Sequence, residues 1–250
     1  MIEIRNIKKI FKDKVVLNGI SSTFARGKVN LVIGSSGEGK SVLLKCMVGL
    51  IIPEDGEVLF DNRSFINGDN LTKTSIRKEI GMLFQGNALF DSKNVEENVM
   101  FPLDMLTKLS YTDKLDRVNF CLNRVGLRNV NKKMPDELSG GMKKRVGIAR
   151  AIANNSKYLF CDEPNSGLDP KTSLLIDDLI RTITYESGLV TIIVTHDINS
   201  VVSLGDYILF IEKGIKAWEG TSDEVLHVND GPLVDFLFVN KLIKLAKHGL

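Results

Sequence analysis

The sequence contains little cysteine and no long hydrophobic run. Cys46, Cys121 and Cys161 lie far apart and form no Cys-x-x-Cys pair, which excludes a disulfide framework and a zinc site made of cysteine alone. This cysteine usage fits a reducing compartment. No segment has the roughly 18 uncharged apolar residues that a membrane-spanning helix requires. Residues 1–5 include an acid and no long apolar run, so we expect neither a signal peptide nor a chain that crosses a membrane by itself.

An excess of charge of one sign is also absent. The 250 residues include 33 Lys and Arg against 31 Asp and Glu, which gives a formal net charge of +2. A balance this close to neutral argues against a broad nucleic-acid-binding surface, and we predict no nucleic-acid partner. Hydrophobic residues make up 43% of the chain, which is typical of a globular protein with one large or two small domains.

Short apolar runs alternate with helix-like stretches, which is typical of an α/β protein with a mostly parallel sheet. Residues 29–33 are expected to form a buried strand, followed by a glycine-rich turn and a helix over 41–50. From 94 to 153 we predict no strand, only helical segments broken at Pro102, Gly126 and Pro135, and hence a helical insertion in the α/β core. The other strand-like runs are 57–60, 80–84, 158–161, 190–194 and 207–211.

The glycine-rich turn has the pattern GxxxxGK[ST]. Its glycines allow successive main-chain N–H groups to converge on an anion at the start of a helix. Lys40 can reach the β- and γ-phosphates, and the Ser41 hydroxyl can take one position on Mg²⁺. The turn therefore predicts binding of a nucleoside triphosphate. The residues assigned to this phosphate loop are Gly34, Ser35, Ser36, Gly37, Glu38, Gly39, Lys40, Ser41 and Val42.

Two acids end the apolar run 158–161. Asp162 lies at the tip of the expected strand and suits coordination of the same Mg²⁺, while Glu163 is placed to orient a water that attacks the γ-phosphate. An ordinary acidic turn at a strand end is the alternative. Because the chain also has the phosphate loop, we favour the catalytic interpretation.

A third motif, LSGGM at residues 138–142, precedes the basic helical segment 143–151. Ser139, Gly140, Gly141 and the free N–H groups at that helix start would form a second anion site, and a plain helix cap with a glycine hinge is the alternative. With this motif the chain resembles the nucleotide-binding subunit of an ATP-binding cassette (ABC) transporter over nearly its whole length. A simple P-loop kinase or GTPase would lack the second site.

The resemblance implies a fold and an activity. The fold is a P-loop ABC ATPase core of mostly parallel sheet flanked by helices, with an antiparallel β subdomain and an inserted helical subdomain. Within a single ABC domain over 1–250, residues 1–87 and 156–228 would form the core, 88–155 the helical subdomain and 229–250 a helical extension. The activity is hydrolysis of ATP to ADP and phosphate with Mg²⁺.

Further site residues follow from the same resemblance. Gln85 resembles the glutamine that contacts Mg²⁺ and the attacking water and couples to the membrane subunit. Residues 166–169 resemble the loop that crosses the dimer interface, where Asp169 would contact nucleotide. His196 resembles the histidine that contacts the γ-phosphate, and Phe11 the aromatic residue that stacks on adenine. Without the other motifs, a surface glutamine, a structural histidine and a core phenylalanine would be the default interpretations.

Such ATPases are similar in acting as head-to-tail dimers, with two ATP molecules held between the phosphate loop of one chain and the LSGGM segment of the other. The resemblance implies a homodimer or a pair with a related ATPase chain. It also implies an integral-membrane permease that holds the cytoplasmic ATPase on the inner membrane as a peripheral subunit.

Two residues depart from the common pattern. Met142 stands where most of the superfamily has glutamine, which removes one polar contact near the nucleotide. Glu38 places an acid in the phosphate loop, and we expect its side chain to face solvent because an inward carboxylate would repel phosphate. Since Lys40, Ser41 and the residues assigned to catalysis are all present, we expect a hydrolytically competent site.

Residues 82–92 and 94–103, with the LSGGM variant, resemble a narrower group, the MlaF-like ATPases of Mla/Mce-type phospholipid and lipid transporters. In that group the ATPase works with an MlaE-like permease and an MCE-domain lipid-binding protein. A small-molecule ABC importer and a cell-division-type regulatory ABC complex are the alternatives. Ala88, Leu89 and Phe90 would form an apolar surface that receives the permease, with internal packing as the alternative.

Residues 232–250 alternate apolar side chains with lysines, so they could pack on a partner, rest on an anionic membrane, or dock as a helix on their own domain. ABC proteins that act on DNA or ribosomes carry long heptad arms or two cassettes with a charged linker, and this chain has no heptads and one cassette. We therefore expect a transport ATPase. The residues of the extension that carry the pattern are Leu233, Phe236, Leu237, Lys241, Ile243, Lys244, Leu245 and Lys247.

Overall fold

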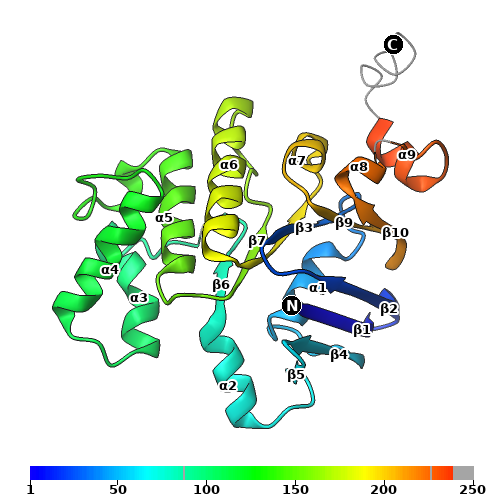
Figure 1. Cartoon of the computed structure of the whole chain (residues 1–250), viewed down its shortest axis with the longest axis horizontal. Helices are drawn as coiled ribbons and strands as arrows, with labels where there is room; N and C mark the ends of the chain where they lie inside the picture. Colours follow the sequence, from blue (N-terminus) through cyan, green and yellow to red (C-terminus); the bar gives the residue numbers. More distant parts are fainter. Residues whose placement is uncertain (87, 226, 239–250) are drawn as a thin grey trace. The chain divides into compact units, whose positions relative to one another are not determined.

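A computed structural model describes residues 1–86, 88–225 and 227–238 (Figure 1). Its contacts divide the chain into two compact units. Unit 1 consists of residues 1–25, 29–67 and the segment from 194 onward, and unit 2 of residues 26–28 and 68–193. Among the described residues, no helix combines the length and apolarity that a membrane span requires.

Unit 1 contains a four-stranded antiparallel sheet in the order β2-β1-β4-β5. Ile2 of β1 lies opposite Phe24 of β2 and Phe60 of β4, and all three side chains are fully buried. This sheet confirms the antiparallel β subdomain that the resemblance implied. Its strands are β1 (Ile2–Phe11), β2 (Lys14–Phe24), β4 (Asp55–Phe60) and β5 (Arg63–Ser64).

The second sheet of unit 1 leads into the phosphate loop. Strand β3 pairs in parallel with β9, and β9 pairs antiparallel with β10. The helix predicted over 41–50 is shorter, because Gly49 adopts a left-handed φ of 73° and the N–H groups of Leu50 and Ile51 turn back to the Lys45 carbonyl. The elements are β3 (Lys28–Ile33), α1 (Lys40–Met47), α7 (Ile198–Ser203), β9 (Tyr207–Glu212), β10 (Ile215–Thr221), α8 (Ser222–Val225) and α9 (Pro232–Phe238).

Unit 2 contains strands in the order β8-β7-β6, with β6 and β7 parallel. Every residue of β7 and β8 is buried, which explains their continuous apolar sequences. The last two residues of β8 belong to unit 1. The elements of this α/β part are α2 (Asn70–Glu79), β6 (Ile80–Leu83), β7 (Tyr158–Asp162), α6 (Pro170–Ser187) and β8 (Val190–Thr195).

Three helices that lie between β6 and β7 in the sequence pack against one another in unit 2 (Figure 1). As predicted, residues 94–153 contain no strand. The predicted break at Pro102 is wrong: α3 continues through it, because the buried Val99 and Leu103 hold this face of the helix in the core. The elements are α3 (Val95–Leu106), α4 (Tyr111–Arg124), the 3₁₀ helix η1 (Pro135–Glu137) and α5 (Gly140–Ile152).

Helix α9 covers the described part of the C-terminal extension. Leu233 and Leu237 are buried, and the Phe236 ring lies 5.4 Å from the ring of Phe210 in β9. These contacts favour a helix docked on its own unit. Lys241, Ile243, Lys244, Leu245 and Lys247 lie outside the described residues, and the division of the chain at residues 88, 155 and 229 stays a prediction.

Candidate functional site

The phosphate loop of unit 1 needs glycine at both ends. A side chain at Gly34, which follows β3, would place its Cβ 2.3 Å from the Ile211 carbonyl oxygen. At Gly39, which caps α1 with φ 98°, a Cβ would lie 2.9 Å from the Val16 oxygen. Only glycine fits these close approaches, and the loop curls as the motif predicts.

Lys40 lies within the curl of this loop. Its side chain is 6% exposed, and Nζ donates to the Gly34 and Ser35 carbonyl oxygens at 2.8 Å each. Ser41 follows in the first turn of α1 and is half-buried, as is Val42. Ser35, Ser36 and Gly37 are exposed, so the rim of the loop faces solvent. This arrangement can present main-chain N–H groups and a cation to a phosphate.

Glu38 differs from the expectation that its side chain faces solvent. Its side chain is half-buried, and its carboxylate accepts a hydrogen bond from the main-chain N–H of Lys213, in the turn between β9 and β10. The expectation that the carboxylate avoids the inside of the loop is met in another way, because a hydrogen bond to the neighbouring turn holds it.

Phe11 and His196 also belong to unit 1. Phe11 ends β1 and is 44% exposed, with Lys9 Nζ 5.1 Å from the centre of its ring, so the alternative of a core phenylalanine is wrong. An exposed aromatic face can stack on a base. His196 follows β8 directly and is exposed, while its neighbour Asp197 caps α7 by accepting from Asn199 N–H at 2.9 Å.

Unit 2 brings Gln85 and the two acids to one sheet edge. Leu83 of β6 lies opposite Cys161 of β7 in a parallel pair, so Gln85 and Glu163 each lie two residues beyond paired positions. Gln85 is exposed, whereas Asp162 and Glu163 are buried. The carboxyl ends of adjacent parallel strands are a common place for binding residues.

Both units carry oxygen donors of the kind that Mg²⁺ prefers. Asp162 and Gln85 of unit 2 offer a carboxylate and an amide oxygen, and Ser41 of unit 1 offers a hydroxyl oxygen. That the three bind one Mg²⁺ stays a prediction. Within residues 1–86, 88–225 and 227–238, no three His, Cys, Asp or Glu side chains cluster into a metal cage. Proteins often bind Mg²⁺ with one or two carboxylates together with substrate phosphates and water, so the small number of carboxylates here is consistent with such a site.

Lys144 of α5 was not predicted as a site residue. It is 2% exposed, and its Nζ lies 3.4 Å from the Glu163 carbonyl oxygen. Burial lowers the pKa of Lys144, and the nearby Cys161, Glu163 and Asp162 oppose this shift. The available signal was its spacing: Lys144, Ile148 and Ile152 recur every four residues, which places the lysine on the apolar face of the helix.

Helix α5 begins inside the LSGGM motif. Ser139 caps the helix by accepting from the Met142 N–H at 3.3 Å, and the glycine pair forms the first turn instead of preceding it. Ser139 and Gly140 are exposed. The start of the helix therefore presents N–H groups and a hydroxyl that can meet an anion.

Asp169 caps α6. One carboxylate oxygen accepts from the Thr172 N–H at 3.0 Å and the other from the Thr172 hydroxyl at 2.5 Å. These hydrogen bonds lower the pKa of Asp169, so its charge is held at the helix start. The structure shows this capping role, and the predicted contact with nucleotide stays a prediction.

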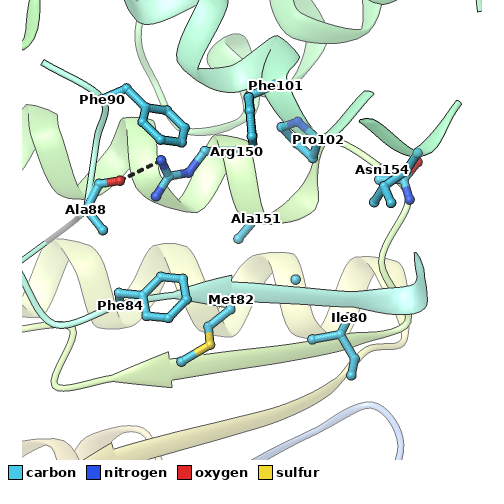
Figure 2. A pocket seen from close by; sticks show the side chains of 12 residues that line it. Ile80, Met82, Phe84, Ala88, Phe90, Phe101, Pro102, Arg150, Ala151 and Asn154 are labelled. Atoms are coloured by element: carbon cyan, nitrogen blue, oxygen red, sulfur yellow. Dashed lines mark hydrogen bonds between the residues drawn. The ribbon is translucent and has the colours of Figure 1, made fainter. Parts of the chain in front are cut away.

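An apolar cavity of about 370 Å³ lies in unit 2, and its lining includes Phe84, the residue before Gln85. Figure 2 shows Phe90, Phe101 and Pro102 on one side of it and Ile80, Met82 and Phe84 on the other. Arg150 lies beside Phe90 and donates to the Ala88 carbonyl oxygen at 2.8 Å, with its guanidinium 5.9 Å from the Phe90 ring centre (Figure 2). Phe90 packs on Phe101 yet stays 39% exposed, so it combines internal packing with an open apolar face. Leu89 is not among the lining residues.

Comparison with known proteins identifies the family of the chain. The family described as ABC transporter matches residues 17–166. The chain is 37% identical to the intermembrane phospholipid transport system ATP-binding protein MlaF of Haemophilus influenzae, over 95% of this chain and 90% of that protein. It is also 37% identical to the methionine import ATP-binding protein MetN of Campylobacter jejuni, over 100% of this chain and 79% of that protein.

A solved structure extends the similarity to three dimensions. It is the dimeric post-hydrolysis state of the ATP-binding cassette MJ0796 bound to ADP and Pi, with a TM-score of 0.81 and 32% identity over 89% of this chain and 99% of that chain. The ABC ATPase fold predicted from the motifs is confirmed. The chain belongs to the ABC transporter family, as an ATP-hydrolysing, ATP-binding subunit.

Proposed function

We propose that this ABC ATPase drives the movement of phospholipid or another lipid between membranes. The observation that carries the proposal is the similarity to MlaF, which extends over 95% of this chain and 90% of the relative. The LSGGM variant at 138–142 and residues 82–92, which resemble the Mla/Mce group, support it.

In the proposed mechanism, each ATP contacts two copies of the cassette. The phosphate loop surrounds the phosphates with N–H groups, Lys40 neutralises charge on the β- and γ-phosphates, and Phe11 stacks on adenine. Ser41, Gln85 and Asp162 would hold Mg²⁺, whose charge stabilises the phosphates. Glu163 takes a proton from water as the water oxygen attacks the γ-phosphorus. The bond from the γ-phosphorus to the oxygen bridging the β-phosphate breaks, so ADP and inorganic phosphate form, and His196 contacts the γ-phosphate.

The second chain completes each site. Ser139, Gly140 and Gly141 of one copy would bind the γ-phosphate held by the other, so ATP joins the two copies and hydrolysis releases them. The MJ0796 cassette, similar over 89% of this chain, is dimeric. The second copy is this chain itself or a related ATPase.

The apolar cavity of unit 2 is the proposed docking site for the permease. Its apolar lining and the exposed face of Phe90 suit an apolar side chain from a cytoplasmic segment of an MlaE-like membrane protein. An MCE-domain protein would carry the lipid onward. The ATPase would therefore act at the cytoplasmic face of the inner membrane, as a peripheral subunit.

Small-molecule import is the second candidate, because the methionine import protein MetN is equally identical at 37%. A regulatory ABC complex of the cell-division type is the third, since its cassette would look almost the same.

Purification of the tagged chain from solubilised membranes, with mass spectrometry of co-eluting proteins and lipids, separates the three candidate functions. We expect a multi-span permease, an MCE-domain protein and phospholipid. A solute-binding protein in place of the MCE-domain protein would contradict lipid transport and indicate import.

A further inference from the structure

The main chain at Glu163 has a conformation that few residues adopt. Its φ is 50°, which lies in the left-handed region. For any residue other than glycine this conformation costs free energy, and it persists only where the surrounding structure stabilises it. The Glu163 carbonyl oxygen accepts from the Ser166 N–H at 3.2 Å and from Lys144 Nζ at 3.4 Å. The second donor comes from α5, a helix distant from Glu163 in sequence.

Burial of the Lys144 ammonium needs a compensating interaction. The side chain is 2% exposed, and its neighbours on the same helix face include Ile148 and Ile152, which are buried and apolar. A methionine would fill a similar volume without the cost of desolvating a charge. The hydrogen bond to the Glu163 carbonyl, and the nearby carboxylates of Asp162 and Glu163, offset that cost.

The first turn of α5 also packs closely on the segment that follows Glu163. A Cβ at Gly140 would lie 3.5 Å from Leu168 Cδ2, and one at Gly141 would lie 2.8 Å from Thr172 Cγ2. Helix α5 therefore contacts residues 163–172 at two places. Lys144 contacts Glu163, and the glycine pair lies against Leu168 and Thr172. A shift of the helix cannot leave both contacts unchanged.

We propose that Lys144 is a positioning residue that fixes the Glu163 main chain and joins the LSGGM helix to the general base of the same chain. The inference rests on the proposed roles of Glu163 and of the LSGGM segment. In the dimer, that segment of one chain contacts the ATP bound to the other. Binding there would move α5 and, through Lys144, adjust Glu163 at the chain's own ATP, so the two nucleotide sites would communicate along a single helix.

The test compares Lys144→Met with Lys144→Arg, which keeps a charged donor, and with Lys143→Met, a matched change at the neighbouring, less buried lysine. Amide hydrogen exchange of the segment 158–169 is measured in the full chain without nucleotide. We expect exchange about 10-fold faster in Lys144→Met, because the turn loses one of its anchors. Lys144→Arg and Lys143→Met are expected to match the wild type. Equal exchange in Lys144→Met and the wild type would overturn the proposal.

Kinetics provide the second readout. In Lys144→Met we expect kcat to fall about 10- to 100-fold with KM for ATP unchanged, since the base is displaced while the phosphate loop is intact. Lys144→Gln, which keeps an N–H donor, is expected to lie between Met and the wild type. Equal loss in Lys144→Arg, or a change in KM alone, would contradict positioning. If Glu163→Gln hydrolyses ATP normally, the assignment of the base fails, while the exchange experiment still tests Lys144.

Discussion

Among the residues of the site, Glu163 is the one whose substitution should lower the rate of ATP hydrolysis most. It lies directly after β7, buried, at the sheet edge that also holds Gln85. Glu163→Gln keeps the size of the side chain but removes the base, so we expect hydrolysis to fall at least about 100-fold while ATP still binds. Steady-state ATPase assays and equilibrium nucleotide binding measure the two effects.

Glu186→Gln is the matched control, because Glu186 is an exposed acid of the same unit that pairs with Arg124 at 2.6 Å. An exposed pair of this kind contributes little, so its ATPase activity should equal that of the wild type. Hydrolysis by Glu163→Gln within a factor of about two of the wild type would exclude the carboxylate as the general base.

The cysteines allow an independent test of the packing. Burial raises the pKa of Cys161 to about 12 and that of Cys46 to about 11, and it also raises the pKa of Cys121. Since the thiolate is the reactive form, we expect no thiol to react with a disulfide reagent at pH 8 in the folded chain, and all three to react in denaturant. Rapid reaction of one thiol in the folded chain would show that its surroundings are open.

At the scale of the element, alanine substitutions at two glycines of the phosphate loop should lower the stability of the chain by different amounts. At Gly34 a Cβ would meet the Ile211 oxygen at 2.3 Å, whereas at Gly37, with φ 87°, nothing lies within 4 Å. We expect Gly34→Ala to destabilise the chain by about 3 kcal/mol and Gly37→Ala by about 1 kcal/mol. Urea unfolding without nucleotide gives the comparison, and equal midpoints would show that the loop does not approach β9 as described.

The helical insertion should lose stability in acid through Glu96 of α3. Burial raises the pKa of this carboxyl, but hydrogen bonds from Lys132, Asn131 and Tyr111 together lower it below its usual value. The stabilisation is therefore present above the unfolded pKa of about 4.3 and is lost as the pH falls through the lower folded value.

Glu96→Gln should accordingly be less stable than the wild type at pH 7 by about 1–2 kcal/mol, and the difference should shrink below about pH 4. Thermal unfolding over this pH range measures it. A difference that stays constant down to pH 2 would show that the charge of Glu96 is not what stabilises the helices.

Contiguous features could be predicted from sequence, and features that depend on tertiary contacts could not. The strands β7 and β8 are continuous apolar runs, and the phosphate loop is a single segment, so each can be recognised directly in the sequence. The continuation of α3 through Pro102 depends on its buried face. Lys144 is the lysine of the basic run 143–145 that turns inward. Its four-residue spacing with Ile148 and Ile152 indicates the apolar face of α5, but its hydrogen bond to the Glu163 carbonyl oxygen depends on a tertiary contact that the spacing does not predict.

At the scale of the whole molecule, docking should depend on the apolar cavity of unit 2. Phe90→Asp places a charge on its exposed face, so we expect much less permease to co-purify with the chain, while the isolated chain binds ATP normally. Leu71→Asp is the control, since Leu71 is 82% exposed on α2 and does not line the cavity. Undiminished co-purification of Phe90→Asp would place the permease contact elsewhere.

Transfer of phospholipid driven by ATP tests the proposed function most directly. The tagged chain is purified with its membrane partners, reconstituted in vesicles that contain fluorescent phospholipid, and lipid transfer is followed with and without ATP. We predict transfer that requires ATP and is lost when Glu163→Gln replaces the wild-type chain. A complex that hydrolyses ATP but transfers lipid at the same rate without ATP would contradict lipid transport.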